Sequence, residues 1–280
     1  MLLHEWTLVF FTVLVQAAVG IVLGGEYLLR RADNCAERKS IRRQSCIAFA
    51  LFAVAGVISL GHTGSPFNSF YTILNIGSSW LSREIAVLGL TGFAFLWLAF
   101  MRWKAEEQAS ERIAALLVIV FGCVLIAVMS RVYRLSVVPA WDSWAGFLTF
   151  FGSVFLLGSL WHGMMSAKGD EAKKFGSALV VPAFVGLVLA SAGVPLAVPT
   201  TAGCVNPSTV FIPASCIASY LSLRMVLTVL GMSTFTLSVI RTVQGSGRWA
   251  CVPTLAFALA LAGELLGRSM FYASYARLGM

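Results

Sequence analysis

Two ionisable side chains, His62 and Glu84, lie on either side of a polar stretch that separates two long apolar runs. The unperturbed pKa of an imidazole, about 6.5, suits reversible proton transfer. The turn Gly64-Ser65-Pro66 follows the histidine and predicts space and free backbone groups for a planar ligand, so Ser65 is a candidate contact. The pattern predicts a site where a small molecule exchanges protons with the protein.

Simpler roles remain open for both residues. His62 could cap a helix or bond a loop carbonyl. Glu84 begins an apolar run, where a carboxylate is stabilised by the helix dipole whatever its function.

Three further charged residues interrupt apolar runs near the other end of the chain. Arg224 follows Leu-Ser-Leu, and Glu264 and Arg268 are four residues apart, which places them on one helix face within pairing distance. A charge at membrane depth is costly and usually faces the interior of a bundle, where it marks a site. The predicted ligand-binding set is therefore His62, Ser65, Glu84, Arg224, Glu264 and Arg268, with His62 and Glu84 as the catalytic pair.

The composition is that of an integral membrane protein. Of 280 residues, 59% are hydrophobic and 11% charged, and the mean hydropathy is +0.86. Soluble domains average about 25% charged residues. The net charge of +8 comes from short loops between apolar runs, which argues against a nucleic-acid partner; in a chain surrounded by membrane lipid, such loops indicate orientation.

The apolar runs predict an all-α, polytopic bundle that forms a single unit over residues 1–280. Each run is long enough to cross about 30 Å of hydrocarbon as a helix. The eight expected helices span about 6–29, 44–61, 84–103, 112–131, 144–167, 177–198, 218–241 and 249–269.

The basic residues predict the orientation. Fourteen of the twenty fall in the loops after the first, third, fifth and seventh helices, and six fall on the other side. By the positive-inside rule, those loops are cytoplasmic and both termini lie outside. The charged groups of the predicted site then gather in the outer half of the membrane.

The cysteines and histidines limit the cofactors. Cys204 and Cys216 share one outer loop, where they either form a disulfide or stay unbridged. No CxxC or ferredoxin-like spacing predicts an iron-sulfur cluster in this chain, and no metal site is expected. His162 is expected to snorkel at the inner surface and Glu26 to be solvated there. Since His62 and His162 are placed at opposite faces, a haem with two axial histidines is not expected.

The expected outer loops are rich in aromatic residues. Trp80, Trp141 and Trp144 fit an interfacial aromatic belt, and equally a surface on which a partner docks. His4-Glu5-Trp6 is expected to anchor the first helix at the same edge.

Several short stretches, in this order, together resemble the membrane-anchor subunit of the anaerobic dimethyl sulfoxide reductase family. They cover both ends of the chain and most of the expected outer loops, and as a set they are specific. The stretches are His4-Glu5-Trp6, GHTGSPFNSF at 61–70, Leu81-Ser82-Arg83-Glu84-Ile85, Arg131-Val132-Tyr133 with Val138-Pro139-Ala140-Trp141, Arg224-Met225-Val226-Leu227, and LAGELLGRSMFY at 261–272 with Leu278-Gly279-Met280.

The resemblance implies a subunit that oxidises menaquinol and carries no haem. It implies a heterotrimer in the bacterial inner membrane, in which an iron-sulfur subunit with [4Fe-4S] clusters and a molybdopterin catalytic subunit with a molybdenum cofactor dock on the periplasmic side. The family's quinol histidine falls on His62, and a carboxylate that affects quinol binding falls on Glu84. Thr63, where the family has Leu, and Arg83, where it has a polar amide, depart from the pattern. The terminal acceptor and the quinone species stay open.

Two other readings compete with this one. A transporter or exporter would show an inverted repeat with paired broken helices, but Pro182 and Pro195 have no counterpart in another half. A purely structural anchor would have the same helices without a quinol site.

Overall fold

The fold is known from a computed structural model that describes residues 2–61, 66–104, 109–136, 138, 141–166, 169–201, 214–245 and 251–273. Within these ranges the chain forms eight α-helices, one 3-10 helix and no strand. All eight α-helices are long and apolar enough to cross a membrane, which confirms the predicted class. The helices are α1 (Leu2–Leu29), α2 (Cys35–Leu60), η1 (Pro66–Asn75), α3 (Trp80–Trp103), α4 (Ala109–Val132), α5 (Ala145–Met165), α6 (Gly169–Thr201), α7 (Ala214–Val243) and α8 (Val252–Ala273).

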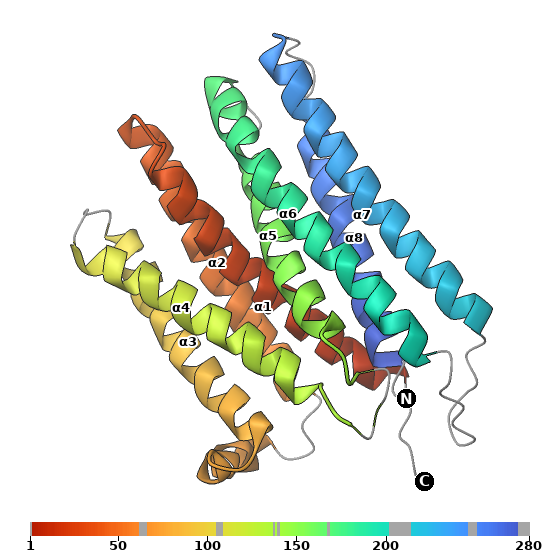
Figure 1. Cartoon of the computed structure of the whole chain (residues 1–280). Helices are drawn as coiled ribbons and strands as arrows, with labels where there is room; N and C mark the ends of the chain where they lie inside the picture. The colour runs from red at the N-terminus through yellow and green to blue at the C-terminus, as the bar shows by residue number, and fades with distance from the viewer. Residues whose placement is uncertain are drawn as a thin grey trace.

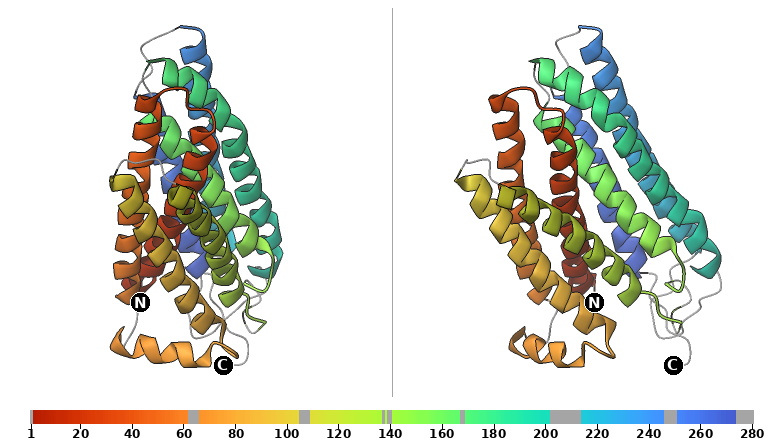
Figure 2. Two further views of the ribbon diagram at one scale, coloured as in Figure 1. Left: turned by 90° about the vertical axis from the view of Figure 1, so that its left-hand side faces the viewer. Right: turned by 60° about the vertical axis from the view of Figure 1, so that its left-hand side comes forward.

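The helices lie side by side as four antiparallel pairs, in the order α3–α4, α1–α2, α5–α6 and α7–α8 across the molecule (Figure 1). α1 begins and α8 ends at the same end of the bundle, which we call the terminal end; the other is the opposite end. η1 lies across the terminal end, next to the start of α3 (Figure 2). Every odd-numbered helix therefore begins at the terminal end.

α1 and α5 form the centre of the bundle. Most of their spanning windows is buried, 72% for α1 and 61% for α5, against 28–39% for the other helices. Glycines allow this close packing: a Cβ atom on Gly158 of α5 would lie 2.4 Å from the backbone carbon of Gly20 on α1. Small residues at such crossings let membrane helices approach through their backbones.

Several helices extend beyond their predicted apolar cores because polar residues continue the same helix. α2 begins at Cys35 instead of about residue 44, capped by Asn34, whose side chain accepts a hydrogen bond of 2.8 Å from the backbone N–H of Glu37. α3 begins at Trp80, capped by Ser79. Glu84 therefore lies in the second turn of α3, and the prediction that it opens the helix is wrong.

Candidate functional site

Arg268 is the centre of a buried polar cluster where α1, α5, α7 and α8 meet. Its side chain is 3% exposed, and its Nη2 donates hydrogen bonds to Gln16 Oε1 at 2.9 Å and to Ser153 Oγ at 3.5 Å. The guanidinium also lies 3.7 Å from the centroid of the Phe150 ring. A cation buried this deeply is held by charge-assisted hydrogen bonds and by the ring together.

Glu264, one helical turn earlier on α8, is 1% exposed. Its carboxylate accepts a hydrogen bond from the Ser153 hydroxyl. It also forms an ion pair with Arg224 of α7, whose Nη2 lies 3.4 Å away. A Cβ atom on Gly267 would lie 2.3 Å from Nε of Arg224, so this glycine gives the arginine room to cross α8. The sequence spacing predicted a direct pair of Glu264 with Arg268; instead Ser153 lies between the two.

We call this group the terminal cluster; it consists of Gln16, Ser153, Arg224, Glu264 and Arg268. The terminal cluster is not balanced in charge. It holds two guanidinium groups and one carboxylate. Among the described residues, Nε of both arginines and Nε2 of Gln16 are buried without a hydrogen-bond partner. Buried donors of this kind are costly unless water or a ligand oxygen accepts from them. The cluster is therefore suited to bind an electron-rich oxygen.

An aromatic cap, formed by Tyr133, Trp141, Phe271 and Tyr272, covers the terminal side of this cluster. Trp141 and Phe271 stack with ring centroids 5.2 Å apart, and Nε1 of Trp141 donates to the Phe271 carbonyl at 2.8 Å. Tyr133 packs edge-on against the other rings of the cap. Trp141 is only 9% exposed, so it belongs neither to an interfacial belt nor to an open docking surface. Trp144, 61% exposed, still fits the belt.

Glu84 lies beside the aromatic cap and is 6% exposed. Burial raises the pKa of Tyr133 well above its ordinary value, and the nearby Tyr272 hydroxyl and Glu84 carboxylate raise it further. Within the described ranges, no residue donates a hydrogen bond to Glu84 or pairs with it. The proton-transfer role of Glu84 stays a prediction.

The structure brings together four of the six predicted site residues at the terminal end. Arg224, Glu264 and Arg268 share one cluster, and Glu84 lies next to the cap above it. His62 and Ser65 lie outside the described residues, as do Cys204 and the side chains of His4, Glu5 and Cys216. Gln16 and Ser153 were missed by sequence reasoning. Gln16 is the one amide in the apolar run of the first helix, which could have drawn attention to it.

A second buried network lies at the opposite end and corrects one expectation. Glu111 accepts from Arg42 at 2.5 Å and from Arg102 at 3.0 Å, and Arg102 also bonds Glu26 and Ser45. Glu26 is therefore an ion-pair partner and not a solvated surface group. This opposite-end network joins α1, α2, α3 and α4.

His162 does not snorkel to the surface either. Its side chain is fully buried, with Nε2 2.7 Å from the Ile21 carbonyl of α1, to which it donates. A Cβ on Gly24 would lie 2.8 Å from the imidazole, so the ring fills a space that this glycine leaves. The imidazole thus tightens the crossing of α1 with α5.

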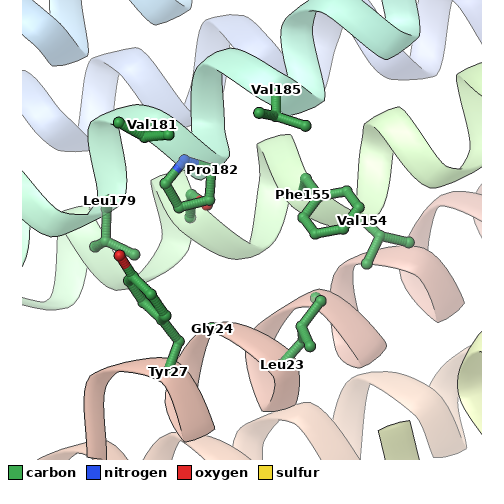
Figure 3. Close-up of a pocket in the computed structure, with 11 residues that line it drawn as sticks. Leu23, Gly24, Tyr27, Val154, Phe155, Leu179, Val181, Pro182 and Val185 are labelled. Atoms are coloured by element: carbon green, nitrogen blue, oxygen red, sulfur yellow. The ribbon is translucent and has the colours of Figure 1, made fainter. Parts of the chain in front are cut away.

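An apolar pocket of about 370 Å³ lies between α1, α5 and α6 (Figure 3). No residue of the terminal cluster or of the opposite-end network lines it. Leu23, Val154 and Val185 contribute to its walls. At its edge the Tyr27 hydroxyl donates a bond of 3.2 Å to the Ala178 carbonyl. This carbonyl lacks its usual helical donor because Pro182, four residues on, has no N–H. The lining is chemically suited to hydrocarbon and offers no acid or base.

No group of three or more metal-ligating side chains occurs in the part of the protein that the structure describes. Eight spanning helices with a buried, charge-unbalanced cluster near one end define a multi-pass membrane protein with an intramembrane polar site.

Comparison with known proteins gives the family. The family model described as DMSO reductase anchor subunit (DmsC) matches residues 1–274. The sequence is 30% identical over 284 residues to the anaerobic dimethyl sulfoxide reductase protein YnfH of Escherichia coli strain K12, covering 99% of this protein and 97% of that one. It is 30% identical over 293 residues to the C subunit of the anaerobic dimethyl sulfoxide reductase of the same strain, again covering 99% and 97%. The C subunit of the Haemophilus influenzae enzyme is 33% identical over 155 residues, which cover 52% of this protein and 54% of that subunit.

The protein therefore belongs to the DMSO reductase anchor subunit family, and the sequence-based resemblance is confirmed. It is the membrane-anchor subunit of a DMSO reductase-type oxidoreductase complex. This membership favours the anchor over the transporter alternative.

Proposed function

We propose that this anchor subunit binds and oxidises a quinol, menaquinol in particular, at the terminal end of the bundle. The electrons pass to an iron-sulfur partner with [4Fe-4S] clusters, and from there to a molybdopterin catalytic subunit, in a heterotrimer. The proposal includes the topology that the basic loops predict, with both termini outside. It also includes the location that the family resemblance implies, the bacterial inner membrane with both partners on the periplasmic side. The anchor itself supplies binding and proton transfer, and the metal chemistry belongs to the partners.

The observation that carries the proposal is the unsatisfied donor set of the terminal cluster. Arg268, Arg224 and Gln16 present buried N–H groups in apolar surroundings, and Glu84 lies beside the aromatic cap that covers them. A quinone head group is planar and apolar with an oxygen at each end, so it can accept from such donors while its ring packs against aromatic side chains. The isoprenoid tail is proposed to enter laterally from the lipid.

Oxidation of a quinol requires acceptors for both hydroxyl protons as well as for the electron pair. Glu84 is positioned as one proton acceptor, and His62, through the family resemblance, as the other. Ser65, three residues after His62 in the sequence, is proposed to contact the head group. The cations of the terminal cluster stabilise the negative charge that develops on a quinol oxygen as its proton leaves.

The test separates quinol oxidation from assembly of the complex. In membranes that contain the whole complex, His62→Ala and Glu84→Gln should each lower turnover driven by reduced menaquinone analogue by about 100-fold or more, as expected for loss of a general base. Turnover driven by a reduced viologen, which delivers electrons directly to the partner subunits, should stay at the wild-type rate.

Asp142→Asn is the matched control for Glu84→Gln. Asp142 is a carboxylate at the same end of the bundle, but its side chain is 41% exposed and pairs with Arg134 at 3.1 Å. It should leave both activities unchanged. Wild-type quinol turnover in both the His62 and Glu84 variants would show that the anchor has no quinol site of this kind.

A further inference from the structure

A cleft of about 720 Å³ opens between α2 and the end of α3, at the opposite end of the bundle. Five cationic side chains line it, together with Cys35, Cys46 and Trp103, and no carboxylate lines it among the described residues. The cations are Arg38, Lys39, Arg42, Arg43 and Arg102. Basic loops can orient a membrane protein when their cations are scattered. Orientation alone therefore does not explain why five cations are gathered in one recess.

Two of these cations are held in place by the opposite-end network. Arg42 and Arg102 are 8% and 6% exposed, and both bond Glu111. Their guanidinium planes are therefore fixed before any ligand arrives, which reduces the entropic cost of binding. Guanidinium groups match the oxygens of a phosphate in geometry as well as in charge.

Lys39 and Arg43 add exposed positive charge at the mouth of the cleft. They are four residues apart on α2, which places them on one face. Across residues 26–43 and 102–112, nine basic residues stand against six acidic ones, so this end of the bundle keeps a net positive charge. An anion is therefore attracted to the cleft.

The surroundings of the cleft favour an anion that carries hydrocarbon. Trp103, at the rim, is 84% exposed, as is usual for a tryptophan at a membrane interface. Toward the middle of the bundle, Ile47 and Val54 of α2 and Phe100 of α3 are exposed apolar side chains. A charged recess above an apolar surface has the same division into polar and apolar parts as a phospholipid.

We propose that the cleft between α2 and α3 is a binding site for an anionic phospholipid. The phosphate lies among the arginines and Lys39, and the acyl chains run along the exposed apolar side chains of α2 and α3. The site lies at the other end of the bundle from the terminal cluster, so it is independent of quinol oxidation.

The experiment measures lipid binding to the anchor purified with its partner subunits in detergent. Short-chain phosphatidylglycerol, phosphatidylcholine of the same acyl length and inorganic phosphate are titrated separately, and bound lipid is counted by native mass spectrometry. The wild type should bind phosphatidylglycerol at least about tenfold more tightly than phosphatidylcholine. The double variant Lys39→Gln, Arg43→Gln should lose most of this preference, with a roughly tenfold or larger drop in affinity.

Arg112→Gln is the matched control, because Arg112 is an exposed cation at the same end that does not line the cleft. It should bind like the wild type. Phosphatidylglycerol should also raise the unfolding temperature of the wild type, a measurement that needs no variant. Equal affinity for the two lipids, an unchanged double variant, or displacement of the lipid by equimolar inorganic phosphate would each overturn the proposal.

Discussion

The opposite-end network and the terminal cluster of this protein differ in charge balance and in the length of their polar contacts. In the opposite-end network, Arg42 and Arg102 are matched by Glu26 and Glu111, and the contacts to Glu111 are 3.0 Å or shorter. In the terminal cluster, two arginines share one carboxylate, and the contacts of Arg224 with Glu264 and of Arg268 with Ser153 are 3.4 and 3.5 Å.

This difference separates a network whose charges are balanced without a ligand from a cluster whose charges are not. A buried ion pair repays the cost of desolvation only when charge and hydrogen bonds are balanced. The opposite-end network is balanced in charge, although Nε of Arg42 is buried without a hydrogen bond, and it connects four helices. The terminal cluster does not meet this condition by itself, and retains buried N–H donors that a ligand can use. Variants in the two regions should therefore fail in different ways.

The largest effect is expected from Glu111→Ala in the opposite-end network. Removal of this carboxylate leaves Arg42 and Arg102 without their shared partner in a buried position. Breaking a buried pair in this way costs about 3–5 kcal/mol, so the purified protein should unfold at a markedly lower temperature.

The control for this variant is Asp142→Asn, which removes one partner of an exposed pair with Arg134 and should cost less than about 1 kcal/mol. Both are compared by thermal unfolding in the same detergent. Equal stability of the two variants would mean that the opposite-end network contributes no more than a surface pair, and would remove the basis of the comparison.

An intermediate effect, of a different kind, is expected from Arg268→Met in the terminal cluster. Methionine keeps apolar contact with Phe150, and the remaining Arg224 and Glu264 are then balanced in charge. Removal of the excess buried charge offsets the loss of the hydrogen bond to Gln16, so stability should change by less than about 1 kcal/mol. The KM for quinol should rise by about tenfold or more, because a charged donor is lost.

Kinetics with the reduced quinol analogue and with viologen, together with thermal unfolding, measure these effects. A fall in stability as large as that of Glu111→Ala, with an unchanged KM, would assign the terminal cluster a structural role as well.

Much of this arrangement could be predicted from the sequence. Hydropathy defines each apolar run, so the number of helices follows from the number of runs that are long enough to span a membrane. Charged residues inside these runs, such as Arg224, Glu264 and Arg268, are easily recognised. The neutral partners of these charged residues cannot be recognised in the same way. Gln16 and Ser153 have common residue types for membrane helices, and only the three-dimensional packing shows that both contact Arg268.

Three of the errors have one physical cause. Sequence position gives the depth of a residue in the membrane, but not the direction in which its side chain points around the helix. Glu26 and His162 were placed correctly near one end and wrongly toward solvent, because Arg102 and the Ile21 carbonyl offer buried partners. Trp141 was assigned to the surface for the same reason, although its indole stacks on Phe271.

The smallest effect is expected from Tyr27→Phe, which tests a buried contact without charge. The Tyr27 hydroxyl satisfies the Ala178 carbonyl that Pro182 leaves without a helical donor. Losing one neutral hydrogen bond should cost about 1 kcal/mol in thermal unfolding and leave quinol kinetics unchanged. Tyr71→Phe, at a 70% exposed position, should cost nothing. A loss for Tyr27→Phe as large as that for Glu111→Ala would contradict the claim that charge balance, and not burial alone, makes the opposite-end network strong.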